Sequence, residues 1–166
     1  MARVDIDPIT VLTTVETALQ NGLNISPDLC YLSLDPDENY PAPGPGDRII
    51  IIEPEGANFS ENLFWGGGPR QVTIETAVNL QIYSGVRVDP NAKKQRLALI
   101  DSARGIFQLM IAIMDTLVGV DLTAGGNTFL RELMRPIGFS QPAKIDNNLL
   151  HSSMSWAISY DWLNTQ

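Results

Sequence analysis

The sequence predicts an α+β fold, in which a small antiparallel or mixed β-sheet packs on one long helix and a short helix lies near the N-terminus. From residue 72 to 82 every even position except Thr76 is aliphatic, and from 153 to 162 apolar residues again occupy the even positions. Such alternation is typical of a strand with one buried face. Between these two strands, residues 92–118 have the three- and four-residue apolar spacing of an amphipathic helix.

The N-terminal helix is expected from Pro8 to about Asn21. Asp7 can cap its free backbone amides, and proline is favourable at the first helical position. Gly22 can then adopt the left-handed conformation that ends a helix. One apolar stripe follows the helical spacing and is expected to face the core: Ile9, Leu12, Val15 and Leu19. A short strand is expected over residues 30–34, ending in a turn-rich segment.

A second strand is expected over residues 48–53, because four consecutive isoleucines are typical of a strand buried on both faces. Pro54 is expected to end this strand. Residues 54–69, which include aromatic residues and three consecutive glycines, are then expected to form a long loop, and loops of this length inside a compact domain are often functional. No internal repeat or linker divides the chain, so residues 1–166 are predicted to form a single domain.

The long helix is expected to turn one stripe toward the sheet: Leu97, Ile100, Phe107, Ile111, Met114 and Val118. Gly105 lies in its middle, where glycine costs up to about 1 kcal/mol relative to alanine, and a close approach to a strand would explain it. The helix starts with the bases Lys93, Lys94 and Arg96, although the helix dipole disfavours cations there. This cluster is a candidate contact surface. Residues 123–141 fit either a short helix or a strand.

Charge is distributed unevenly along the 166 residues. Residues 1–69 hold eleven acids and two arginines, a net charge of −9, whereas the rest of the chain carries +1. An acidic surface repels phosphates, which argues against a function that depends on binding a nucleic acid backbone. The only cysteine, Cys30, cannot form an internal disulfide and is interpreted as a small core residue. No apolar segment fits a signal peptide or a membrane span.

Three short patterns resemble chemical sites, and each lacks an essential part. Residues 35–39 match the start of a calcium loop, but Tyr40 stands where glycine is required and Gly46 where glutamate is required. The glycines after Trp65 are not followed by the Lys-Ser/Thr of a phosphate-binding loop. His151, the only histidine, has no Ser-His-Asp or Cys-His context. The sequence therefore predicts no catalytic residue, no metal and no cofactor.

The middle strand Gln71–Tyr83 and the terminal strand Ser152–Trp162 stand in an order of elements that resembles the tail terminator proteins of long-tailed bacteriophages. The resemblance covers nearly the whole chain. It implies a structural virion protein, not an enzyme, that forms a hexameric ring, caps the tail tube and joins it to the neck. The implied partners are further copies of the chain, the tail tube or sheath protein, and a neck or head-completion protein. DNA would pass through the lumen without specific binding. The protein would be made in the host cytoplasm, would lie in the tail–neck region of the virion and would contact no membrane.

Two groups of residues are candidates for functional surfaces of such a ring. The candidate subunit interface comprises Phe64, Trp65, Lys93, Lys94 and Arg96, and the candidate lumen-facing acids are Asp35, Asp37, Glu38, Glu53 and Glu55. Head-tail joining proteins, whether neck adaptors or head closure proteins, share the layout and remain an alternative. A different class is a small cytosolic α+β module that binds a ligand in a pocket between the long helix and the sheet.

Overall fold

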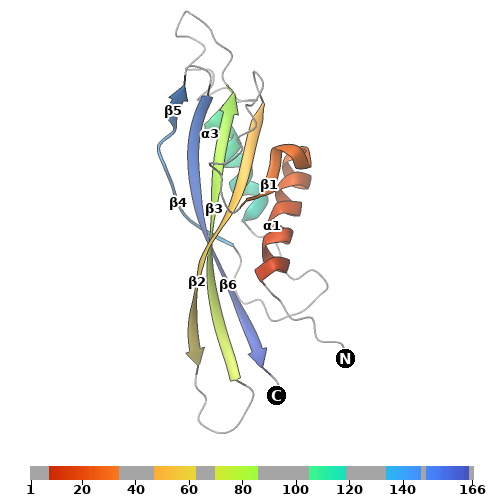
Figure 1. Ribbon diagram of the computed structural model, residues 1–166, viewed down its shortest axis with the longest axis vertical. Coiled ribbons are helices and arrows are strands. Elements are labelled where there is room, and N and C mark those ends of the chain that lie inside the picture. The colour runs from red at the N-terminus through yellow and green to blue at the C-terminus, as the bar shows by residue number, and fades with distance from the viewer. Residues whose placement is uncertain are drawn as a thin grey trace, which may run out of the picture.

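The computed structural model describes six stretches of the chain: residues 8–33, 47–62, 70–85, 105–118, 134–146 and 149–164. They contain two α-helices, a 3₁₀ turn and six strands (Figure 1). In chain order these are α1 (Pro8–Leu23), η1 (Pro27–Leu29), β1 (Cys30–Leu32), β2 (Arg48–Asn62), β3 (Arg70–Gly85), α3 (Ile106–Leu117), β4 (Arg135–Phe139), β5 (Ala143–Asp146) and β6 (Leu149–Asn164).

The six strands form one mixed sheet in the order β1-β2-β3-β6-β4, and β5 also pairs with β6. β1 runs parallel to β2, whereas every other pairing is antiparallel. The central pair, β3 and β6, stays in register over its whole length, from Arg70 opposite Asn164 to Gly85 opposite Leu149. The predicted α+β class is therefore confirmed for the described residues.

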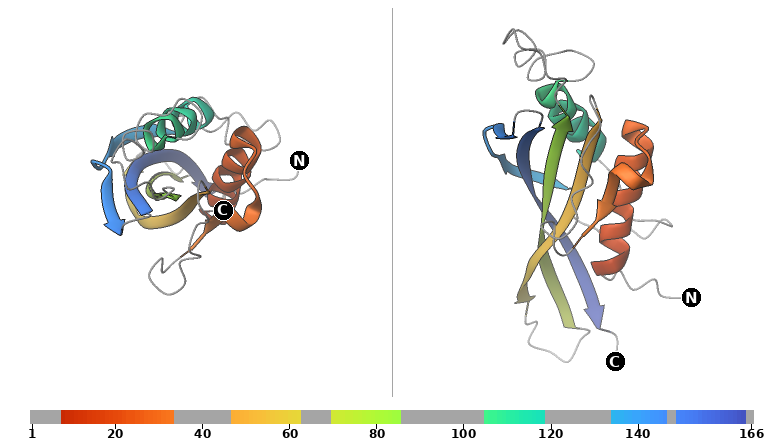
Figure 2. Two further views of the ribbon diagram at one scale, coloured as in Figure 1. Left: turned by 90° about the horizontal axis from the view of Figure 1, so that it is seen from above. Right: turned by 45° about the horizontal axis from the view of Figure 1, so that its top comes forward.

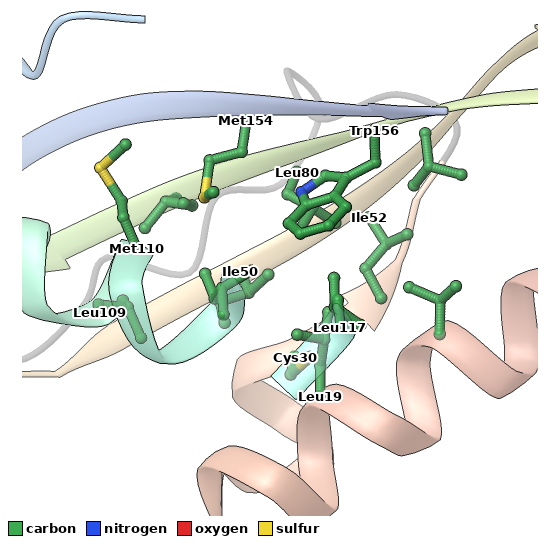
Figure 3. Close-up of a cluster of buried hydrophobic side chains, with 14 of the residues drawn as sticks. Leu19, Cys30, Ile50, Ile52, Leu80, Leu109, Met110, Leu117, Met154 and Trp156 are labelled. Atoms are coloured by element: carbon green, nitrogen blue, oxygen red, sulfur yellow. The ribbon is translucent and has the colours of Figure 1, made fainter. Parts of the chain in front are cut away.

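Both helices lie on one face of the sheet, and the main core fills the space between them (Figures 1 and 3). The alternation predicted for the two central strands is confirmed, because the even residues are buried on this face: Val78, Leu80, Ile82, Met154, Trp156 and Ile158. The four isoleucines of β2, Ile49 to Ile52, are buried on both faces as predicted. Each such side chain contributes roughly 1.5–3 kcal/mol through burial of its apolar surface.

Three strands continue past the helices as a narrow, twisted arm (Figures 1 and 2). The arm comprises residues 57–62 of β2, 70–76 of β3 and 158–164 of β6. The strands remain paired along it, with β3 in the middle. In Figure 1 no described helix lies over the arm, which distinguishes it from the rest of the sheet.

The N-terminal helix is confirmed, but its predicted end is wrong. Val11, Val15 and Leu19 form its buried face, and the helix passes Gly22 before ending at Leu23. The left-handed residue is Asn24, with φ of 50°. Gly22 serves a different purpose: a Cβ there would lie 2.5 Å from Cγ2 of Thr116 in α3, so glycine allows the two helices to approach closely.

The prediction of one long helix over residues 92–118 is wrong in its described part. The helix α3 begins at Ile106, and Gly105 is its N-cap residue in an extended conformation with φ −67° and ψ 147°. Glycine therefore stands at the start of a helix and not within one. The predicted inner stripe is also wrong, because the buried residues are Ile106, Leu109, Met110, Ile113 and Leu117. Residues 92–104, with Leu97 and Ile100, lie outside the described residues.

The predicted end of β2 at Pro54, and with it the first part of the predicted loop over residues 54–69, is wrong. Pro54 pairs with Val78, and the strand continues to Asn62 after a bulge before Ala57. In the regular ladder before the bulge, the Ile52 carbonyl accepts a bond from outside the β2–β3 pair. By alternation the nitrogen of Pro54 also faces outward, where a missing N–H breaks no bond.

The ambiguous segment 123–141 is a strand in its described part, which begins at residue 134. Pro136 and Gly138, which were expected to close the element, lie inside β4, where a register shift separates them. The neighbouring β5 was not predicted at all. None of the helices in the described stretches is both long and apolar enough to span a membrane.

Candidate assembly surfaces

Most of the residues predicted to form a site lie outside the described stretches. This is true of all five interface candidates, namely Phe64, Trp65, Lys93, Lys94 and Arg96, and of the acids Asp35, Asp37 and Glu38. Glu53 and Glu55 are described. Glu55 is exposed beside the bulge of β2, whereas Glu53 is half-buried on the face of the sheet opposite the helices. Of the two predicted groups, the structure therefore places only these two acids.

The outer edge of β1 is capped by side chains of α1. The Glu16 Oε1 atom accepts a hydrogen bond from the backbone N–H of Leu32 at 3.1 Å. The Gln20 Nε2 group donates to the Cys30 carbonyl at 2.8 Å. These bonds satisfy backbone groups that would otherwise be free at the edge of the sheet. Helix α1 thus packs on the core and also closes one edge of the sheet.

The opposite edge, formed by β6, is covered near the helices by β4 and β5. β4 pairs with β6 over residues 154–157, and β5 pairs over residues 149–151. Ser140 extends the cover between them, because its N–H donates to the Ser153 carbonyl at 2.8 Å. Its hydroxyl accepts from the Ser153 N–H, also at 2.8 Å. The backbone of β6 is thus paired on both sides up to residue 157.

Both outer edges of the arm are open in the described part of the chain. No described strand pairs with β6 beyond Ala157 on the side away from β3. β1 pairs only with residues 50–52 of β2, so residues 57–62 likewise lack a described strand on their outer side. Such edges are templates for pairing with another chain. The open edges are the first candidate assembly surface.

The outward face of α3 is the second candidate. Its residues recur at the spacing of one helix face and remain exposed: Phe107 (38%), Ile111 (49%), Met114 (37%) and Val118 (53%). These are the described members of the stripe predicted to face the core. A helix with one apolar face in the core and another in solvent presents a surface suited to a protein partner. Three more exposed apolar side chains lie on β4 and β5: Ile137, Phe139 and Ile145.

The face of the sheet opposite the helices carries a chain of polar contacts. The Gln81 Nε2 group donates to Glu53 Oε2 at 2.8 Å, so its Oε1 atom accepts from His151 Nε2 at 2.6 Å. The ring of Tyr83 packs against that of His151 with centroids 4.8 Å apart and the planes tilted by 34°. Burial lowers the pKa of His151, while the Glu53 carboxylate acts to raise it. The arrangement holds a neutral histidine with its proton on Nε2.

The histidine and the cysteine lie apart from each other. His151 bonds through Nε2 to the Gln81 amide, whereas Cys30 lies in the main core on the other face of the sheet. Burial, aided by the Glu16 carboxylate, raises the pKa of the Cys30 thiol to about 12, which makes it a poor nucleophile. Among the described residues no three His, Cys, Asp or Glu side chains are placed to hold a metal ion. The interface between α3 and the sheet is filled by buried side chains (Figure 3).

The sequence predicted assembly through the edges of the sheet but neither the arm nor the outward apolar face of α3. A signal for the outward face of α3 is present, since only Gln108, Asp115 and Thr116 are polar among its twelve residues. A helix that is apolar on nearly every side cannot bury all of its surface on one sheet. The arm is not predicted from the sequence because Pro54 is expected to end β2.

The chain matches no model of a known protein family. No curated protein is significantly similar to it in sequence.

Proposed function

We propose that this protein is a structural subunit that assembles into a ring in a bacteriophage virion, where it caps the tail tube as a tail terminator. The observation that carries the proposal is the arm, whose two open edges lie on opposite sides of a strongly paired three-stranded ribbon. A subunit with two unlike contact edges can bind a copy of itself on each side, and such contacts close into a ring when the rotation between subunits allows it.

The exposed stripe of α3 supports the same proposal. An apolar helix face is suited to a lasting protein contact, either with the adjacent subunit or with the next ring along the tail. The resemblance of the element order to tail terminators supports the choice of that assembly. Head-tail joining proteins share the layout, and no contact in the described residues favours them over a terminator.

The hypothesis that acids line the lumen of the ring keeps only part of its support. Glu55 is exposed and free to present charge. Glu53 is bonded to Gln81, and its second carboxylate oxygen is buried without a hydrogen-bond partner in the described structure. We therefore expect Glu53 to organise the sheet surface, whereas Glu55 is the described acid suited to repel passing DNA. A ring structure with Glu55 on its outer rim would contradict this role.

The proposal is tested by measuring the mass of the purified chain with size-exclusion chromatography and light scattering, combined with negative-stain images. We expect closed rings. On virions that contain this chain, a gold-labelled antibody is expected to mark the junction of tail and head. A chain that stays monomeric at all concentrations, together with virions that carry no label there, would overturn the proposal.

A pair of charge variants tests whether α3 takes part in assembly. Ile111→Asp places a charge on the outward face of α3, and we expect the ring fraction to fall at least tenfold while stability changes by no more than about 0.5 kcal/mol. The matched control, Thr17→Asp, places the same charge at an exposed position of α1 and should leave rings intact. Equal assembly by both variants would remove α3 from the interface.

A further inference from the structure

The backbone of the arm selects one way for two copies to join. We infer that adjacent subunits join head to tail by strand pairing, with β6 residues 159–163 of one copy beside β2 residues 57–61 of the next. This inference rests on the ring proposed above and names its contact. The partner is a second copy of this chain, which supplies a strand at each edge of the arm where no described strand pairs.

The direction of the free groups on β6 follows from bonds nearer the helices. The N–H of Ser153 donates to the hydroxyl of Ser140, and the carbonyl of Ser153 accepts from the N–H of Ser140. The backbone N–H and C=O groups of Ser153 therefore point away from β3. β6 pairs with β3 without a register shift, so alternation continues along the strand. Residues 159, 161 and 163 consequently present their N–H and C=O groups at the open edge, whereas residues 160 and 162 bond to β3.

The free groups of β2 follow in the same way. The Ile52 carbonyl accepts from the N–H of Ser33 at 3.0 Å, so Ile52 faces outward from the β2–β3 pair. Ile52 stands opposite Leu80, and after the bulge Ala57 stands opposite Thr76, which has the same parity on β3. The bulge adds one residue and shifts the alternation. The backbone N–H and C=O groups of residues 57, 59 and 61 therefore point to the open edge. These three positions match the three on β6.

Strand direction and symmetry favour pairing between unlike edges. β2 and β6 both run antiparallel to β3, so they are parallel to each other. Two arms placed side by side in the same orientation bring β6 of one against β2 of the next as a parallel pair. Two-fold pairing of like edges would leave the second edge of every copy open. Head-to-tail pairing covers both edges in every copy, and a closed ring leaves no free edge.

Proline at an outward position removes a donor from the open edge without breaking a bond to β3. Asp161→Pro blocks the β6 edge, and Glu61→Pro blocks the β2 edge. Pro54 in β2 and Pro136 in β4 are native examples of prolines inside strands of this sheet. The matched controls Asp161→Ala and Glu61→Ala remove the same side chains and keep the N–H. Trp162→Pro, at a position whose N–H bonds to β3, tests the parity itself and should lower the melting temperature sharply.

The decisive measurement is the mass of each variant and of their mixture. We expect both outward proline variants to lose rings and run as folded monomers, with circular dichroism and melting close to their alanine controls, which form rings. Asp161→Pro retains a free β2 edge, and Glu61→Pro retains a free β6 edge. Mixed in equal amounts, they should therefore form a complex of one copy each, with twice the mass of the monomer.

Each other outcome has a defined meaning. A dimer of Glu61→Pro alone indicates like pairing of β6 edges, a dimer of Asp161→Pro alone indicates like pairing of β2 edges, and either overturns the head-to-tail contact. Rings that persist in both variants exclude the arm edges as the contact but leave the proposed ring function standing. An unmodified chain that forms no rings, alone or in virions, overturns the proposed function itself. Outward variants that unfold while Trp162→Pro stays folded overturn the parity.

Discussion

Where the sheet lies under the helices, Glu16 and Gln20 of α1 bond to its outer strand, whereas β2 and β6 run on into the arm with no described strand on their outer sides. The same two strands thus meet different conditions along their length. In the covered half their edges are closed and their even residues form the core. In the arm the ladder to β3 persists and no described strand covers the outer edges, an arrangement that an isolated monomer would tend to avoid.

The contrast separates residues that hold the fold from residues that are available for assembly. Substitutions in the covered half should lower stability first, and assembly only as a consequence. Substitutions at the edges of the arm should lower assembly first. Four substitutions, each with a control, test this division through their effect on stability.

Ile158→Asp should be the most destabilising of these changes. Ile158 is fully buried at the junction of core and arm, and an unpaired carboxylate there should cost about 4 kcal/mol. Urea unfolding followed by circular dichroism measures the loss. The control Ala157→Asp places the same group on the other face of β6, opposite Arg135, and should cost less than about 1 kcal/mol. Equal losses of stability would mean that the face of β6 with Ile158 is no more buried than the face with Ala157.

Gly22→Ala should cost about 1–3 kcal/mol through overpacking, even though alanine is the better helix former. The added methyl group would meet Cγ2 of Thr116. Thr116→Ser removes that carbon and retains a hydroxyl that can donate to the Ala112 carbonyl. The double variant should therefore recover most of the loss in a double-mutant cycle. Additive effects would show that the α1–α3 contact is not limited by this pair.

Glu16→Ala should cost about 1–2 kcal/mol, because the N–H of Leu32 loses its acceptor at the edge of β1. Glu16→Gln keeps an oxygen acceptor and should lose less. Glu16→Ala also opens an edge of the sheet that the native protein closes. Light scattering of Glu16→Ala should reveal more non-specific association than Glu16→Gln shows. Identical behaviour would indicate that α1 does not protect this edge.

Thr76→Val should have the smallest effect and the opposite sign. Thr76 is buried at the junction of core and arm, and its hydroxyl has no hydrogen-bond partner in the described structure. Valine has nearly the same shape without the cost of burying a polar atom, so stability should stay level or rise by up to about 1 kcal/mol. Thermal melting beside Thr76→Ser provides the check. A clear loss in the valine variant would reveal a partner for the hydroxyl.

The central strands and the first helix could be predicted from the sequence because the apolar spacing of each fits only one buried face. The period-2 pattern of β3 and β6 fits a single buried face, and the structure places Leu80 and Trp156 on it as expected. Helix α3 could not be oriented in this way. Its inner residues, such as Leu109 and Ile113, and its outer residues, such as Phe107 and Ile111, follow the same helical spacing. Periodicity alone cannot decide which of two apolar faces meets the sheet.

Prolines and glycines account for most of the remaining errors. Pro54 and Pro136 were expected to end elements, yet both lie in strands whose outer sides tolerate a missing donor. Gly105 was expected inside a helix and is its N-cap residue. Each of these residues is compatible with two conformations, and for the two prolines a distant strand partner decides between them. Of the predicted site residues, only Glu53 and Glu55 lie in the described stretches.

The bulge in β2 sets the phase of the arm relative to the covered half. Glu55 and Gly56 lie between the positions opposite Val78 and Thr76, so the strand gains one residue on its neighbour. Before the bulge the backbone N–H and C=O groups of even-numbered residues point away from β3, and after the bulge those of odd-numbered residues do. If the same residues paired in a regular ladder without the bulge, each later residue of β2 would move one place along β3, and its backbone N–H and C=O groups would turn to the other side. The two bulge residues, directly before the proposed contact, thereby determine which backbone groups β2 offers to a neighbouring chain.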